Sequence, residues 1–375
     1  MERVVIPTGV VDVFVVGGGP AGLAAAIAAS HKGLSVVVAD GAEPPIDKAC
    51  GEGLMPETQT ALRDLGVELP AGAGYRFRGL QFIEGYAQVA ADFPKGWGIG
   101  VRRTLLHEVL IQDAEKCGVK LLWKAQVTGI AREGVRLSTG TMRARWIIGA
   151  DGSNSRVRRW SELGAALHFS QRVASRRHYR VRPWSEFVEI YWSDRAQAYV
   201  TPISSDEVCI VVTGETAEDA NFERMLQALP ELHERLIGAE LCSRERGAIT
   251  VMQSLARVYR GNVALVGDAS GGVDAITGEG LRLAFRQAVA LADAMELGNL
   301  RKYERVHRKL ARRPMWMGKL MLELGRNSEM RARALRAMRR NPRLFDRVLA
   351  IHVGQATPGA SVLTGAQLGW QFLAG

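Results

Sequence analysis

The sequence predicts an α/β protein that combines a Rossmann-like dinucleotide-binding domain, an inserted antiparallel β-rich substrate lobe and a C-terminal helical tail. Three observations support this prediction: a glycine turn between an apolar strand and an alanine-rich helix near the N-terminus, a strand-rich middle, and a basic, helix-forming end. We expect a discontinuous dinucleotide-binding domain of residues 1–75, 97–165 and 248–298, a β-rich substrate lobe of residues 76–96 and 166–247, and a basic helical segment of residues 299–375.

The dinucleotide-binding domain is predicted from the glycine turn. Residues 13–16 are apolar and mostly β-branched, as in a buried parallel strand. Gly17, Gly19 and Gly22 then have the G-x-G-x-x-G spacing, which allows a tight turn, close approach of a pyrophosphate and close packing of the helix on the strand. Asp40 ends the next strand, where a carboxylate accepts hydrogen bonds from a ribose. A tight turn that binds no nucleotide is the alternative, and the full context argues against it.

The other elements follow from hydrophobic periodicity and turn residues. Residues 76–93 alternate around Gly85, which predicts a hairpin, and helices are expected after Pro56 and between Arg103 and Gly118. Further strands are expected at residues 119–123, 125–132, 135–138, 144–148, 178–181, 187–192, 198–203, 208–213 and 263–268, and further helices at residues 222–237, at 281–294 and from about residue 300.

Composition limits the classes of protein that remain. The four cysteines lie at positions 50, 117, 209 and 242 without metal-ligand or C-x-x-C spacing. We therefore expect a reducing compartment, no disulfide framework and no metal site. No signal-peptide pattern is present, and no run reaches the ~18 uninterrupted apolar residues of a spanning helix. The sequence thus predicts a cytoplasmic protein.

The positive charge is a feature of the tail. The formal net charge is +10, and residues 301–347 alone hold sixteen Lys/Arg against four Asp/Glu, a net of +12. Trp316, Leu320, Met321 and Leu324 share one helical face among these basic residues. Such a helix can lie on an anionic membrane or cover the cofactor domain with its apolar stripe, and both alternatives stay open. Membrane contact would suggest a lipid-like substrate. We expect no nucleic-acid partner, because no recognised module is present.

Four separated motifs carry a resemblance to a known group of proteins. They are the GGGPAG turn at residues 17–22, Arg103 in an R-x-x-L-H-x-x-L pattern, the GADG turn at residues 149–152 and the LVGD run at residues 265–268. In this order, over roughly the first 295 residues, they resemble the group A flavoprotein monooxygenases of the para-hydroxybenzoate hydroxylase type and the related geranylgeranyl reductase-like flavoproteins.

The resemblance implies a tightly held FAD. Asp268 would accept bonds from the ribityl hydroxyls, Arg103 would pair with the pyrophosphate, and the helix after Gly280 would face the N1/O2 edge of the flavin. Asp151 would lie between flavin and a transiently docked NAD(P)H, although it could instead cap the helix near Ser153. The implied cofactor-binding residues are Gly17, Gly19, Pro20, Ala21, Gly22, Asp40, Arg103, Asp151, Gly152, Gly267, Asp268, Gly278 and Gly280. The absence of a second G-x-G-x-x-G implies that NAD(P)H binds in a shared groove and leaves.

The loop after Asp40 contains two candidate catalytic residues, Cys50 and Glu52. In the reductase-like relatives a cysteine in a similar C-G-x-G stretch lies against the flavin, and the alternative for Cys50 is an inert thiol beside a turn. Glu52 could donate a proton or be only a loop carboxylate. Aromatic side chains of the predicted lobe could line a substrate pocket or belong to its core; they are Tyr191, Trp192 and Tyr199.

Three functions are compatible with these residues. We favour monooxygenation, in which FAD reduced by NAD(P)H forms a flavin hydroperoxide that hydroxylates an apolar or aromatic small molecule. The second is a flavin-dependent reductase that saturates C=C bonds of an isoprenoid or lipid-like substrate, and the Thr-Gly-Glu-Gly run at residues 277–280 resembles that branch. The third is a non-catalytic flavin-binding redox sensor.

Overall fold

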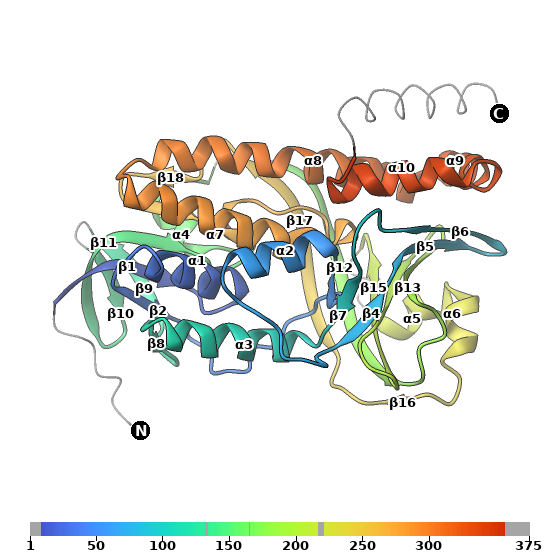
Figure 1. The fold of residues 1–375 in the computed structure, drawn as a ribbon, viewed down its shortest axis with the longest axis horizontal. Helices are drawn as coiled ribbons and strands as arrows, with labels where there is room; N and C mark the ends of the chain where they lie inside the picture. The colour runs from blue at the N-terminus through green and yellow to red at the C-terminus, as the bar shows by residue number, and fades with distance from the viewer. Residues whose placement is uncertain (1–8, 132–133, 165, 217–220, 357–375) are drawn as a thin grey trace.

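The structure is a computed structural model that describes residues 9–131, 134–164, 166–216 and 221–356. It confirms the predicted α/β fold with a second, largely antiparallel sheet and a helical C-terminal region. Figure 1 shows the two sheet regions side by side, with the C-terminal helices along the upper side. The helices are α1 Pro20–Ser30, α2 Pro56–Asp64, α3 Arg103–Lys116, α4 Arg156–Trp160, α5 Phe222–Gln227, α6 Pro230–Arg235, α7 Gly280–Glu296, α8 Leu300–Arg326, α9 Ser328–Arg340 and α10 Pro342–Val353, with short 3-10 turns η2 Gly267–Ser270 and η3 Ala275–Thr277.

The first sheet belongs to the Rossmann-like part. Its order is β18-β19-β11-β1-β2-β8, with β9 and β10 added at β11. The strands are β1 Val10–Val16, β2 Val36–Ala39, β8 Lys120–Leu122, β9 Val127–Ala131, β10 Gly134–Leu137, β11 Gly140–Gly149, β18 Tyr259–Arg260 and β19 Val263–Leu265. The pairs β19-β11, β11-β1, β1-β2 and β2-β8 are parallel. Helices α1, α3 and α7 share one apolar core with this sheet, because parallel strands and apolar helices bury each other.

The second sheet is the β-rich lobe. Its order is β16-β12-β15-β14-β13-β5-β6, with β17 paired to β12. The strands are β5 Gly79–Glu84, β6 Ala87–Asp92, β12 Ala166–Arg180, β13 Phe187–Trp192, β14 Gln197–Pro202, β15 Glu207–Gly214, β16 Glu240–Leu241 and β17 Arg246–Leu255. The predicted hairpin around Gly85 is β5-β6. A third, small sheet of β3 Gly53–Leu54, β7 Gly98–Gly100 and β4 Tyr75–Phe77 lies between the two parts.

Two expectations change in detail. We expected the nucleotide-binding domain to resume at residue 248, but β17 pairs with β12 along nearly its whole length and so lies in the antiparallel sheet. The expected helix at residues 222–237 is divided into α5 and α6, because Pro230 begins a new helix at its first turn. With the boundary moved to the end of β17, we propose the same three-part division of the chain.

The tail covers the lobe with its apolar side. Met321 and Leu324 are buried in one cluster with α9, α10 and residues of β5, β6 and β13, while Trp316 at the same predicted face is 53% exposed. Ring contacts join the layers, since Phe82 stacks on Trp192 and contacts Phe345 of α10. The stripe therefore packs against the body, and mainly against the lobe rather than the cofactor domain. Residues 357–375 of the predicted tail lie outside the described residues.

Candidate functional site

A cavity of about 630 Å³ lies where the glycine turns of the first sheet meet the lobe. Both candidate catalytic residues, Cys50 and Glu52, line it. Among the thirteen expected cofactor-binding residues, Gly22 alone is not in its wall. The wall contains Gly17, Gly19, Pro20, Ala21, Asp40, Arg103, Asp151, Gly152, Gly267, Asp268, Gly278 and Gly280. Turns that are distant in sequence thus meet around one space.

The glycines of the first turn have different roles. A Cβ on Gly22 would lie 1.9 Å from the carbonyl oxygen of Gly17, and a Cβ on Gly17 would lie 2.5 Å from that of Ala150. These two positions are therefore needed for packing of α1 on the sheet. A Cβ on Gly19 would meet no atom within 4 Å, and no side chain caps the start of α1 there. The first N–H groups of α1 are consequently available to an anion in the cavity.

Two polar residues of the cavity wall differ in how far they are already bonded. Asp40 accepts hydrogen bonds from the backbone N–H of Gly18 at 2.7 Å and of Ala42 at 2.8 Å, so it fixes the turn as well as facing the cavity. The Nε–H of Arg103 is buried without a hydrogen-bond partner among the described residues. A buried guanidinium N–H requires an acceptor, and a phosphate would provide one.

The far end of the cavity is built by η2, η3 and the start of α7. Half of the Asp268 side chain is exposed, and its ion pair is with Lys48 at 3.9 Å. Gly278 has φ of +61°, and a Cβ on Gly280 would meet no atom within 4 Å. No side chain caps the start of α7, so its first N–H groups are also available. These residues fit the ribityl and ring portion of FAD.

Asp151 is engaged as a helix cap. Its Oδ2 accepts from the N–H of Arg156 at 2.7 Å and of Val157 at 3.1 Å, and its Oδ1 accepts from the Ser155 hydroxyl. Ser155 is the N-cap residue of α4, and Asp151 supports the same helix start by accepting from its first two N–H groups. The residue still lines the cavity beside Gly152, and a contact with NAD(P)H remains our proposal.

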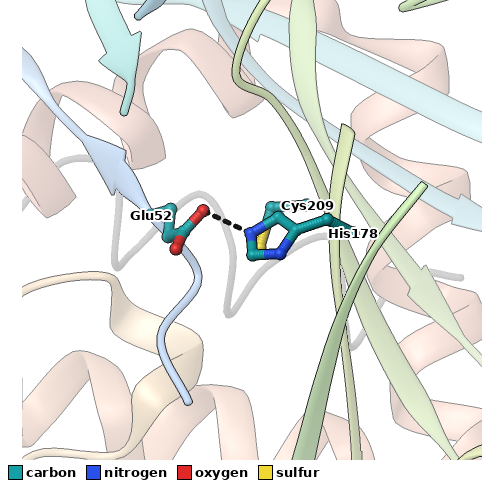
Figure 2. Close-up of side chains that lie close together, drawn as sticks. All are labelled: Glu52, His178 and Cys209. Atoms are coloured by element: carbon teal, nitrogen blue, oxygen red, sulfur yellow. Dashed lines mark hydrogen bonds and ion pairs between the residues drawn. The ribbon is translucent and has the colours of Figure 1, made fainter. Parts of the chain in front are cut away.

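Glu52 is held in a buried network rather than being free. It is 3% exposed, its Oε1 accepts from the backbone N–H of Arg103 at 3.0 Å, and its Oε2 lies 2.7 Å from Nε2 of His178. Figure 2 shows this pair with Cys209 beside it. Because both carboxylate oxygens have partners, the geometry favours the loop-carboxylate alternative over proton donation.

The same cluster does not fit a metal ion. Glu52, His178 and Cys209 offer ligand atoms within 4.8 Å of one another. However, one guanidinium nitrogen of Arg176 lies 2.9 Å from Nδ1 of His178 and 3.7 Å from Oε1 of Glu52, and a nitrogen of Arg102 lies 2.6 Å from the same Nδ1. A buried cation would be repelled by both guanidinium groups. We assign the cluster to ion pairing.

Cys50 lies at the boundary between the cofactor turns and the lobe. Its thiol accepts the N–H of Glu52 at 3.4 Å, and its carbonyl oxygen accepts the thiol of Cys209 at 3.6 Å. The side chain is partly exposed and lines the cavity. The Cys50 side chain is therefore partly exposed rather than buried, and its reactivity stays a prediction.

The lobe supplies an apolar wall that the sequence did not reveal as such. Among the three aromatic candidates, Tyr199 lines the cavity, whereas Tyr191 and Trp192 do not. Burial raises the pKa of the Tyr199 phenol, so it remains a hydrogen-bond donor. Apolar residues of the lobe strands in this wall include Leu80, Val188, Ile190, Val211 and Val251, and Phe77 of β4 and Ile276 of η3 also line the cavity. Their alternation along strands was visible in the sequence, but which face meets the cavity depends on sheet pairing.

The chain is similar to known flavoproteins over most of its length. A family model described as "FAD binding domain" matches residues 10–298. A menaquinone reductase of Mycobacterium tuberculosis is 29% identical over 322 residues, covering 77% of this chain and 78% of that protein. The ubiquinone hydroxylase UbiL of Rhodospirillum rubrum is 27% identical, covering 76% and 72%. A digeranylgeranylglycerophospholipid reductase of Methanothrix thermoacetophila is 26% identical, covering 77% and 79%.

Solved structures support the same fold. A flavoprotein/dehydrogenase from Cytophaga hutchinsonii matches with a TM-score of 0.80 at 20% identity, covering 92% of this chain and 93% of that one. A geranylgeranyl bacteriochlorophyll reductase-like protein from Thermoplasma acidophilum matches with a TM-score of 0.76 at 19% identity, covering 96% and 95%.

Proposed function

Because this chain belongs to the FAD binding domain family, we propose that it is a flavin-dependent oxidoreductase that saturates C=C bonds of an isoprenoid or lipid-like substrate. When bound, FAD supplies hydride transfer. NAD(P)H is the proposed source of electrons. This proposal takes the second of the three functions that the sequence allows, and the reason is the position of one thiol.

The observation that carries the proposal is the place of Cys50. Its side chain lines the cavity between the cofactor turns and the apolar wall of the lobe. A flavin site that activates oxygen exposes a neighbouring thiol to oxidation, and the higher oxidation states of cysteine are irreversible. A site that only delivers hydride needs no oxygen activation beside this thiol. We assign Cys50 the role of proton donor, which completes saturation after hydride has been added to the other carbon.

The remaining residues of the cavity hold the cofactor and shape the site. Arg103 has a buried Nε–H that no described residue accepts, and this donor suits the pyrophosphate. Asp268 is open to the cavity and suits the ribityl hydroxyls. The apolar wall of β5, β13 and β15 excludes water and accepts a hydrocarbon chain; Tyr199 also lines the cavity, with its hydroxyl donating to Oε1 of Gln197 at 3.4 Å.

Monooxygenation is the second candidate function. It is favoured by the similarity to a protein called ubiquinone hydroxylase and by the same apolar wall, which would also protect an oxygen-activating site from water. The non-catalytic redox sensor is a third possibility, and it is distinguished by bound FAD without substrate-stimulated NAD(P)H oxidation.

One experiment separates these functions. The FAD-loaded protein is mixed anaerobically with NADPH or NADH and a polyprenyl quinone, and product mass is followed. Reduction predicts a gain of two hydrogen masses per saturated bond without oxygen. Hydroxylation predicts a gain of one oxygen that appears only after air is admitted. Product formation that requires air would contradict the reductase proposal.

Substitution of Cys50 tests its assigned role. Cys50→Ala should lower the rate of substrate saturation by about a hundredfold, within the usual range for loss of a positioned acid, while FAD content and flavin reduction by NAD(P)H stay unchanged. Cys50→Ser should recover part of the rate because a hydroxyl can still donate. Cys117→Ala is the matched control, since Cys117 ends α3 and is not in the cavity wall. An unchanged rate in Cys50→Ala would exclude the role.

A further inference from the structure

The outer layer formed by α8, α9 and α10 carries a concentration of positive charge. The fourteen Lys/Arg side chains exposed on these helices are Arg301, Lys302, Arg305, Arg308, Lys309, Arg312, Lys319, Arg326, Arg333, Arg336, Arg339, Arg340, Arg343 and Arg347. The exposed acidic side chains on the same helices are Glu323, Glu329 and Asp346. We call the fourteen cations and the layer that bears them the basic layer.

The basic layer faces outward because the opposite side of each helix is used for packing. Most of the buried apolar residues of α8, α9 and α10 belong to the two main apolar clusters of the body, and Figure 1 shows the three helices along the upper side of the described residues. On these three helices the exposed cations outnumber the exposed acidic side chains by fourteen to three. Ion pairs of these cations among the described residues include Arg308 with Glu304 at 3.4 Å, Arg326 with Glu215 at 2.9 Å and Arg333 with Glu329 at 4.0 Å.

The layer also has an aromatic residue and lies on the cavity wall. Trp316 of α8 is 53% exposed, and Lys319 on the same helix lies over the ring of Phe169. Exposed Trp beside Lys and Arg is typical of the membrane interface. Beneath them, a Cβ on Gly318 would lie 3.5 Å from the methyl carbon of Thr277, which lines the cavity. The outer layer therefore rests directly on the loop that closes the site.

We propose that the basic layer docks the protein on an anionic lipid surface. The choice of a lipid surface as the partner of the basic layer rests on the proposed function, because an isoprenoid or lipid-like substrate partitions into a bilayer. Each Lys or Arg near an anionic membrane contributes roughly 1 kcal/mol, and a layer with this excess of cations can be retained without a spanning helix. In the part of the chain that the structure describes, none of the helices has the length and apolar character of a membrane span.

The proposal is tested by binding to vesicles, which needs no turnover and so can fail or succeed independently of the enzymatic proposal. The FAD-loaded full chain is mixed with vesicles of phosphatidylcholine alone or with phosphatidylglycerol added, and bound protein is measured after sedimentation. We expect binding to the anionic vesicles, little binding to the neutral ones, and release as salt rises from about 150 mM to about 500 mM, where screening is stronger.

Matched variants locate the surface. The variant with Arg336, Arg339, Arg340 and Arg343 all replaced by Gln should bind anionic vesicles at least about tenfold more weakly. The control replaces four other exposed cations by Gln, namely Lys120, Arg136, Arg182 and Arg244, and should bind as the unmodified chain does. Retention of FAD and unchanged thermal unfolding show that both variants are folded.

Three results would overturn the proposal: equal binding to neutral and anionic vesicles, equal loss in the variant and the control, and no vesicle binding by a folded, FAD-loaded chain that binds duplex DNA at the same ionic strength. The last result would instead assign the basic layer to nucleic acid.

Discussion

At the scale of single residues, the site depends on which polar groups are already bonded and which are open. Asp40 and Asp151 line the cavity, but both already accept hydrogen bonds from backbone N–H groups: Asp40 from Gly18 and Ala42, and Asp151 from the first turn of α4. Asp268 has instead a side chain that is half exposed and a long ion pair with Lys48. Among the three carboxylates, Asp268 therefore has the most free bonding capacity for a cofactor.

We expect Asp268→Ala to weaken FAD binding by about tenfold to a hundredfold, which corresponds to the loss of a hydrogen bond to a charged group. Titration of the apoprotein with FAD, followed by flavin fluorescence, measures the change. Asp206→Ala is the control, because Asp206 is exposed and bonded within its own turn. Equal affinity of Asp268→Ala and the unmodified chain would contradict the assigned role.

Residue roles were predictable where they are local and obscure where they depend on distant partners. The glycine spacing at residues 17–22 identified the turn because its requirements are met within six positions. Glu52 was found as a candidate, but its role was not, because its partner His178 is 126 positions away. No local pattern in the sequence marks such a pair. The same limitation applies to Tyr199, whose neighbours in the cavity come from other strands.

At the scale of elements, α8 fixes the turn that presents Asp268. The Tyr303 hydroxyl donates to the carbonyl oxygen of Leu265 at 2.6 Å, and Nε2 of His307 lies 2.9 Å from the hydroxyl of Ser270. These contacts join α8 to β19 and η2. Their register could not be predicted from sequence, because an amphipathic helix specifies its apolar face but not the element it covers.

The contact at His307 predicts a dependence of stability on pH. Burial lowers the pKa of His307 to about 4, against an ordinary value of 6.5. Below pH 6.5 the unfolded chain therefore binds a proton that the folded chain does not accept, so the stability is complete above that pH and is lost as pH falls toward 4. His307 alone should reduce the free energy of unfolding by about 2 kcal/mol between pH 7 and pH 5.

We expect His307→Gln to remove this part of the pH dependence, because the amide does not titrate and can still bond Ser270. Urea unfolding at pH 7 and pH 5 measures the difference in the free energy of unfolding, which should shrink by about 2 kcal/mol. His233→Gln serves as the comparison, since His233 is exposed on α6. If His307→Gln kept the full pH dependence, the buried neutral imidazole would not be its source.

Strands, too, were predictable where the sequence signal is local and were missed where the strand depends on a distant partner. The β5-β6 hairpin was predictable because its alternation and its glycine turn are adjacent in sequence. Strand β17 was not predicted, because residues 246–255 have exposed and partly buried positions without clear alternation. It becomes a strand through its long pairing with β12. A partner strand thus outweighs a weak local preference.

At the scale of the whole molecule, the tail is an integral layer. Arg331 of α9 is 1% exposed and bonds Glu84 at 2.6 Å and Asp194 at 2.8 Å, as well as the carbonyl oxygens of Leu324 and Gly325. One guanidinium thus joins α9 to the β5-β6 hairpin, to the turn after β13 and to the end of α8. This contact and the apolar cluster beneath it hold α9 and α10 on the lobe, whereas the first part of α8 packs in the core of the first sheet through Leu300 and Tyr303.

Removal of this guanidinium should loosen the tail as a unit. Arg331→Met leaves the Glu84 carboxylate, whose side chain is 25% exposed, without its guanidinium partner, and loss of a hydrogen bond between charged groups costs about 2 kcal/mol. Arg333→Met on the same helix is the matched control, because Arg333 is exposed and pairs with Glu329 at 4.0 Å; an exposed pair contributes less than about 1 kcal/mol. Chemical denaturation gives the two free energies of unfolding, and hydrogen exchange shows where protection is lost.

Since α8 also rests on the Thr277 loop, we expect faster exchange in α8, α9 and η3 of Arg331→Met, with β1 and β2 unchanged. Equal stability of the two variants would mean that the apolar cluster alone holds the tail in place.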